Sequence, residues 1–170
     1  MTTQHKRYIE KVAMDARNNV VKNGIIDFHT KVLSNEQLKN IVELYSGKIQ
    51  DAQGDEYIEK INNSEYILNC KQPYDCFKAI YGLGCAFLHL DTMDLNETYV
   101  FETPDEKDTE ALFFARTFLM PESLFLLDVV KQTGTDGMCN VFKIADIYNI
   151  DYLHVIARGN DLRCWNPHTP

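Results

Sequence analysis

Residues 74–90 read YDCFKAIYGLGCAFLHL, and this stretch decides the fold of the chain. No Asp, Glu, Lys or Arg follows Lys78 within it, so apolar side chains fall on every side of a helix. A helix that is apolar all round is buried all round. We therefore expect residues 74–90 to form the central helix of the core.

The segments before this helix predict two helices and three strands. Residues 4–23 carry an apolar stripe at helical spacing and end next to Gly24, which predicts a first helix. Ser34 and Gln37 form a capping-box pattern at the start of a second one. Short strands are expected at residues 48–51, 56–61 and 65–70. Turn residues separate them, so an antiparallel meander is the simplest arrangement.

Four further helices are predicted after residue 90. One begins near Thr103 and Pro104 and ends before Pro121. The others are expected at residues 121–131, 139–148 and 151–158, with Gly159 closing the last. The fold class is therefore α+β: N-terminal helices, a small antiparallel sheet, a buried helix and a C-terminal helical group. The glycine loop at 134–137 predicts a core unit, 1–133, and a C-terminal helical pair, 134–170, packed on it.

Composition narrows the classes of function. The 170 residues carry 17 Lys and Arg against 25 Asp and Glu, a net charge of −8, so nucleic acid is not an expected partner. No apolar run is long enough to span a membrane, and a cytoplasmic location is expected. The cysteines are odd in number and contain no C-x-x-C pair, which favours reduced thiols. They are Cys70, Cys76, Cys85, Cys139 and Cys164.

One carboxylate lies in an apolar context. Glu110 precedes Phe114 and Phe118 at intervals of four residues, which places all three on one side of a helix. A buried carboxylate needs a cation, a metal or several hydrogen-bond donors to offset its desolvation. Alternatively, Glu110 lies at the edge of the apolar stripe and reaches solvent. The remaining histidines His5, His29 and His168 are scattered, and we expect them to be exposed.

The two helices around these residues resemble the ImmA/IrrE family of zincin-like metallopeptidases. Residues 77–90 correspond to its H-E-x-G-H helix with the following L-H-L, and residues 110–121, EALFFARTFLMP, correspond to its E-A-N-x-F-A-x-x-L-L-M-P helix. Residues 67–69 resemble its hydrophobic-Asn strand, and residues 144–158 resemble its closing segment. The resemblance covers roughly residues 40 to 162 and implies a zincin-like fold.

The departures from the family motif change the expected function. This chain has Tyr81 for the first histidine, Gly82 for the glutamate and Cys85 for the second histidine. Glycine cannot act as a general base, and a neutral phenol is a poor zinc ligand. The resemblance therefore implies a catalytically dead pseudo-metallopeptidase without a cofactor. We expect it to bind a protein, such as an element repressor or a host immunity protein, as a regulatory or anti-defence factor of a phage or mobile element.

The expected partner-binding groove follows the family's substrate groove, where a partner would add as a strand beside residues 65–70. Its predicted lining is Tyr66, Leu68, Tyr81, Gly82, Cys85 and Glu110.

Two other functions remain open. Cys85 and His89 are four residues apart, and together with Glu110 they would form a shifted zinc site in an active metallo-endopeptidase that cleaves a repressor. The helices predicted at 144–149 and 151–158 would alternatively form a DNA-binding helix-turn-helix. The second of these helices carries only Arg158 as a basic residue, which is unfavourable for phosphate contacts.

Overall fold

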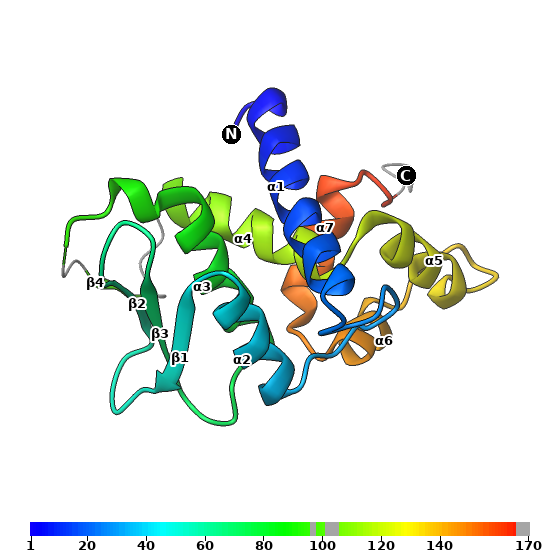
Figure 1. Ribbon diagram of the computed structural model, residues 1–170. Coiled ribbons are helices and arrows are strands. Elements are labelled where there is room, and N and C mark those ends of the chain that lie inside the picture. Colours follow the sequence, from blue (N-terminus) through cyan, green and yellow to red (C-terminus); the bar gives the residue numbers. More distant parts are fainter. Residues whose placement is uncertain (96–97, 101–105, 166–170) are drawn as a thin grey trace.

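The computed structural model describes residues 1–95, 98–100 and 106–165, and these residues form an α+β fold (Figure 1). The helices before the C-terminal group are α1 (Thr3–Lys22), α2 (Asn35–Leu44), α3 (Cys76–His89), the 3-10 helix η1 (Leu90–Thr92) and α4 (Glu106–Leu119). The C-terminal group is α5 (Glu122–Gln132), α6 (Val141–Tyr148) and α7 (Tyr152–Asp161). The strands are β1 (Gly47–Asp51), β2 (Tyr57–Lys60), β3 (Tyr66–Cys70) and β4 (Thr98–Val100). The predicted α+β class is confirmed. The predicted start of α4 at Thr103 and Pro104 lies outside the described residues.

The sheet is mixed, so the predicted antiparallel meander is wrong. The three predicted strands form close to their expected positions, but their order with β4 is β1-β3-β2-β4. β1 runs parallel to β3, while β2 is antiparallel to both β3 and β4. Four of the five β3 residues are buried, whereas β1 exposes three of its five residues. The most apolar strand therefore takes a central place, where backbone partners and core surround it, and the polar strand takes the edge.

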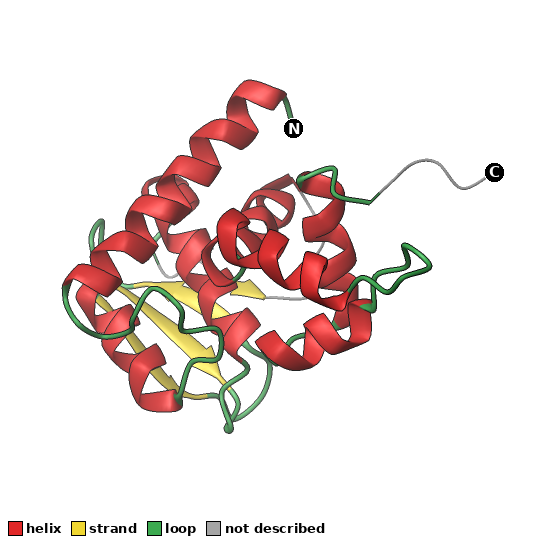
Figure 2. Ribbon diagram, turned by 90° about the vertical axis from the view of Figure 1, so that its right-hand side faces the viewer, coloured by secondary structure: helices red, strands yellow, loops and turns green. Residues whose placement is uncertain are grey.

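Helix α3 packs on β2 and β3 of the sheet and on α4, and this central place agrees with the prediction (Figures 1 and 2). Nine of its 14 residues are buried, and the exceptions are Lys78 and the last turn, residues 86–89. Asp75 caps its start by accepting a hydrogen bond from the Lys78 N–H. Helix α4 crosses it closely at Gly84. A Cβ at that position would lie 2.9 Å from Cδ1 of Phe114, so only glycine permits this approach.

Two buried arginines hold the C-terminal end of α4. Arg17 of α1 donates to the carbonyl oxygen of Phe118 at 2.9 Å, and Arg158 of α7 donates to that of Met120 at 3.0 Å. The last carbonyl groups of a helix have no partner within the helix, and cations at this end also interact favourably with the helix dipole. The N-terminal and C-terminal helices thus meet at one end of α4.

The C-terminal helices bury a second hydrophobic cluster. The first cluster ends at Leu119, and the second begins at Met120 and includes Phe125 of α5. The two clusters therefore separate just before α5, whereas the sequence places the boundary between the units at 133/134. The prediction that Gly159 closes the last helix is wrong, because Gly159 lies inside α7, which continues to Asp161. A Cβ on Gly159 would collide with the indole of Trp165, so this glycine serves packing and not helix termination.

Candidate functional site

The positions that the resemblance aligns with catalytic residues of the ImmA/IrrE family lie in the core of this chain. Tyr81, Gly82 and Cys85 are on the buried part of α3, and Tyr66 and Leu68 of the predicted groove are buried in β3. These five residues do not line an open groove in this structure. β3 is also paired with β1 on one side and β2 on the other, so it offers no free edge to an added strand.

Glu110, the sixth predicted groove residue, is placed differently. Its side chain is 24% exposed and lies between two histidines from other helices. Oε1 of Glu110 is 2.7 Å from Nε2 of His5, and Oε2 is 3.5 Å from Nε2 of His89. The alternative that placed Glu110 at the edge of the apolar stripe is therefore confirmed, with an imidazole as its hydrogen-bond partner.

His5 reaches Glu110 because the buried face of α1 packs along α4. Ile9 and Ala13 of α1 are fully buried, and His5 continues that stripe one turn earlier. The prediction that His5 is exposed is therefore wrong in part, since the side chain is 42% exposed and bonded. Continuing the stripe by four residues would have indicated this position in the sequence. His29 is exposed as predicted, and His168 lies outside the described residues.

A surface cavity of about 650 Å³ adjoins this pair and is lined by Met1, Thr2, His5, Thr109 and Glu110. A carboxylate bonded to an imidazole can hold a cationic or hydrogen-bonding group. The structure brings together His89 and Glu110 of the shifted zinc site. Across residues 1–95, 98–100 and 106–165, no group of three His, Cys, Asp or Glu side chains is placed to hold a metal ion.

Helix α7, the second helix of the predicted helix-turn-helix, does not present a basic face. Arg158 is 1% exposed, and its guanidinium binds the carbonyl of Met120 and the hydroxyl of Thr117. The only arginine of α7 is thus used in the core, where phosphate cannot reach it. Tyr152 and Leu153, at the start of the same helix, are exposed and uncharged.

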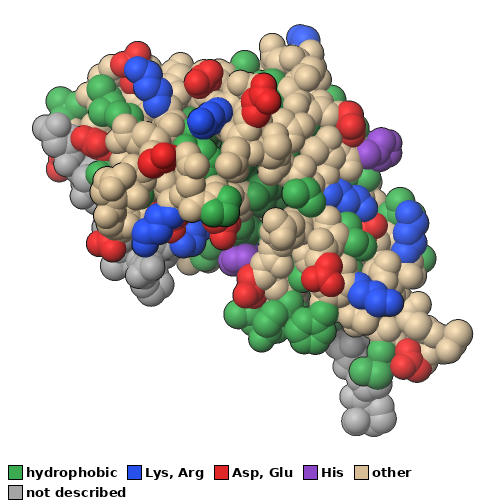
Figure 3. Space-filling view, turned by 90° about the horizontal axis from the view of Figure 1, so that it is seen from below, with side chains coloured by type: hydrophobic (Ala, Val, Ile, Leu, Met, Phe, Trp, Pro, Cys, Tyr) green, Lys and Arg blue, Asp and Glu red, His purple; other side chains and the backbone are tan. Residues whose placement is uncertain are grey.

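Exposed apolar side chains instead gather over the C-terminal helices, as the view from below shows (Figure 3). The rings of Phe142 on α6 and Tyr152 on α7 contact each other at 5.0 Å between centroids, although Phe142 is 62% exposed. Monomeric proteins rarely leave large apolar patches uncovered. The exposed large apolar residues of this part are Leu127, Val130, Met138, Phe142, Tyr152 and Leu153.

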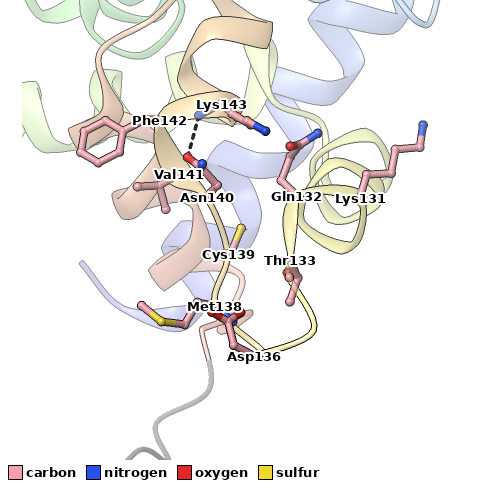
Figure 4. Close-up of a pocket in the computed structure, with 11 residues that line it drawn as sticks. Lys131, Gln132, Thr133, Asp136, Met138, Cys139, Asn140, Val141, Phe142 and Lys143 are labelled. Carbon is pink, nitrogen blue, oxygen red and sulfur yellow. Dashed lines mark hydrogen bonds between the residues drawn. The ribbon is translucent and has the colours of Figure 1, made fainter.

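A cavity of about 600 Å³ lies beside Phe142, between the end of α5 and the start of α6 (Figure 4). Lys131 and Lys143 line it from the two helices, and Asp136 lines it from the connecting loop. The N–H of Lys143 donates to Oδ1 of Asn140 at 3.1 Å, which caps α6 and fixes this side of the cavity. No local sequence pattern marks this surface, because it forms only when α5 packs on α6 and α6 packs on α7.

No family model matches the chain, and no curated protein with which it was compared matches it. The resemblance to the ImmA/IrrE family therefore rests on the residues quoted above. Within the described part of the chain, no helix is both long enough and apolar enough to cross a membrane.

Proposed function

We propose that this chain is a protein-binding factor without peptidase activity, built on a zincin-like scaffold related to the ImmA/IrrE family. Its partner would be an element repressor or a host immunity protein, and its role would be regulatory or anti-defensive in a phage or mobile element. The observation that carries the proposal of binding is the exposed apolar surface of α5, α6 and α7. We call it the C-terminal apolar surface: Leu127, Val130, Met138, Phe142, Tyr152 and Leu153.

The absence of peptidase activity is supported by residue type. Gly82 stands where the family has its general base, and Tyr81 and Cys85 stand where it has the two zinc-binding histidines. Tyr81 and Cys85 are also 3% and 2% exposed, which is unfavourable for a water molecule and a peptide substrate. Glu110, the one remaining ligand position of the family, is bonded to His5.

The binding surface is supported by exposure and shape. Aromatic side chains such as Phe142 and Tyr152 supply most of the energy of many interfaces when they enter a partner's pocket. The adjacent cavity between α5 and α6 provides a hollow that a partner's side chain would fill. Five of the six predicted groove residues, all except Glu110, are by contrast buried in the core.

Tagged protein purified from its native host tests this proposal. The variant Phe142→Glu/Leu153→Glu is expected to lose the copurifying partner while it remains folded, as judged by circular dichroism. Phe28→Glu is the matched control, because Phe28 is also an exposed phenylalanine but lies between α1 and α2. Equal capture by the double variant and by wild type would overturn the proposed surface.

Metal analysis separates binding from the active metallo-endopeptidase. We expect purified protein to hold no stoichiometric zinc. About one zinc per chain, lost in both His89→Ala and Glu110→Ala, would favour the shifted zinc site and repressor cleavage. The zinc content of Cys85→Ala would then show whether the buried thiol is the third ligand.

A further inference from the structure

Two exposed lysines line the cavity between α5 and α6. Lys131 lies in the last turn of α5, and Lys143 is the third residue of α6. Within residues 1–95, 98–100 and 106–165, neither ammonium group has an ion-pair partner. Both charges are therefore accessible to a molecule that enters the cavity.

Asp136, the acidic residue of the lining, lies on the loop between the two helices. Its Oδ1 accepts a hydrogen bond from the Met138 N–H at 3.0 Å and lies 2.8 Å from the place that a Cβ on Gly134 would take. The carboxylate is thus turned back on its own loop, and Figure 4 shows it apart from both lysines. The helical side of the cavity is a local positive site on a chain whose net charge is −8.

Large exposed apolar side chains adjoin the two lysines. Met138 and Phe142 line the same cavity and are 73% and 62% exposed. Phe142 directly precedes Lys143 in α6, and Val130, which is 72% exposed, directly precedes Lys131 in α5. A surface that complements this one needs apolar side chains for the hydrophobic contacts and carboxylates for the lysines.

We propose that the C-terminal apolar surface binds an acidic segment of its partner, in which Asp or Glu side chains alternate with large apolar ones. This inference rests on the proposed function, because it names the chemistry of the partner at the same surface. The carboxylates pair with Lys131 and Lys143, while the apolar side chains cover Val130, Met138 and Phe142. Exposed ion pairs contribute little affinity each, but they select between partners of opposite charge.

Three fluorescein-labelled peptides of equal length test the proposal. Two are amphipathic, with leucine at helical spacing and either glutamate or lysine as the polar residue, and the third keeps the glutamates but has serine for leucine. Fluorescence anisotropy at low salt measures their affinities for the whole protein. The glutamate–leucine peptide is expected to bind about tenfold more tightly than either of the others. The net charge of the chain favours the lysine peptide, so the opposite preference indicates a local positive site.

Charge reversal identifies that site. Lys131→Glu/Lys143→Glu is expected to invert the preference, so that the lysine–leucine peptide binds more tightly. Lys11→Glu/Lys22→Glu is the matched control, because these lysines are exposed on α1 and their reversal changes the net charge equally. The control should still prefer the glutamate–leucine peptide. Should the charge reversal fail to fold, as judged by circular dichroism, Lys131→Gln/Lys143→Gln replaces it and should abolish the preference.

The outcomes separate this inference from the proposed function. The inference is overturned if no leucine peptide binds, if wild type binds both leucine peptides equally, or if the α1 control loses the preference as well. Equal binding of the two leucine peptides would reject the charge preference and leave the apolar binding surface in place. The proposed surface itself fails only when Phe142→Glu/Leu153→Glu retains the copurifying partner.

Discussion

Two carboxylates of the helical part are each held by a basic side chain from the N-terminal region, but their surroundings differ. The Asp128 side chain is 3% exposed, receives Nζ of Lys31 at 2.6 and 2.7 Å, and accepts from the Tyr148 hydroxyl at 2.9 Å. Glu110 is much more exposed, and its partners are the imidazoles of His5 and His89. One carboxylate is enclosed by an ammonium group and a phenol, while the other lies at the surface between two imidazole rings.

The difference shows how burial sets the role of a charge pair. A carboxylate in the core cannot lose its cation without leaving an uncompensated buried charge. A carboxylate at the surface is solvated whether or not its partner is present, so its pair contributes little. Asp128 therefore fixes the packing of α5 and α6 on the N-terminal region, whereas Glu110 can exchange its partner at low free-energy cost.

The largest predicted effect comes from removing the cation at Asp128. Lys31→Met should lower the free energy of unfolding by about 3 kcal/mol, because the carboxylate stays buried without its charge partner. Urea denaturation of both proteins measures this. Lys31→Met/Asp128→Asn is the control and should regain more than half of the loss, since the amide oxygen still accepts from Tyr148. A loss below about 1 kcal/mol in the single variant would place Asp128 in the same class as Glu110.

Tyr148 and Tyr66 are both buried, but among the described residues only the Tyr148 hydroxyl has a hydrogen-bond partner, so replacing each by Phe separates the effect of burial from that of hydrogen bonding. Tyr148→Phe should destabilise by about 1.5 kcal/mol because it removes a donor to a buried charge, whereas Tyr66→Phe should stabilise by about 1 kcal/mol because it removes an unpaired hydroxyl. Burial raises the pKa of both phenols, so both hydroxyls stay neutral. Thermal unfolding followed by circular dichroism measures the two shifts. Changes of the same sign in both variants would contradict the assignment of Tyr66 as unpaired.

A third carboxylate, that of Glu56, makes the free energy of unfolding depend on pH. Burial opposes ionisation of Glu56, but hydrogen bonds from the Lys78 ammonium and the Lys71 N–H more than offset this and lower the pKa of the carboxyl. The unfolded chain therefore takes up a proton first, at a pKa of about 4.3. The stabilisation is complete above that pH and is lost as the pH falls through the lower folded pKa.

Glu56→Gln tests this pH dependence. It should cost about 1 kcal/mol near neutral pH, because the Glu56 side chain, which is 8% exposed, loses the charge that pairs with Lys78. The gap between variant and wild type should close as the pH falls below about 4. Urea denaturation at a series of pH values measures the gap, and a gap that persists in acid would show that packing, and not ionisation, is responsible.

The smallest effect is expected at Glu110. Glu110→Gln should change the free energy of unfolding by no more than about 0.5 kcal/mol, since the pair with His5 is partly solvated. His5→Ala should behave in the same way, and added salt should reduce the effect of either change. A loss above 1 kcal/mol in Glu110→Gln would instead indicate that this carboxylate compensates a charge as Asp128 does.

Local features of the fold could be predicted from the sequence because short-range interactions fix them. Ser34 and Gln37 form the predicted capping box, with the Gln37 N–H donating to Oγ of Ser34 and the Gln37 side chain accepting from the Ser34 N–H. The burial of α3 follows from its lack of charge. The three short strands follow from turn residues and β-branched or aromatic side chains nearby in the chain.

Tertiary packing alone decided the sheet order, the partners of the buried charges and the candidate sites. The parallel pairing of β1 with β3, the contact of His5 with Glu110 and the bonds from Arg17 and Arg158 to α4 join residues far apart in the sequence. No local pattern specifies such pairs, because each depends on how whole elements bury their apolar faces. The sequence by itself determined the approximate position of the seven α-helices and of three of the four strands among the described residues, but β4 was not predicted. The three-dimensional packing determined that Tyr81, Gly82 and Cys85 are enclosed and that exposed apolar side chains lie on α5, α6 and α7.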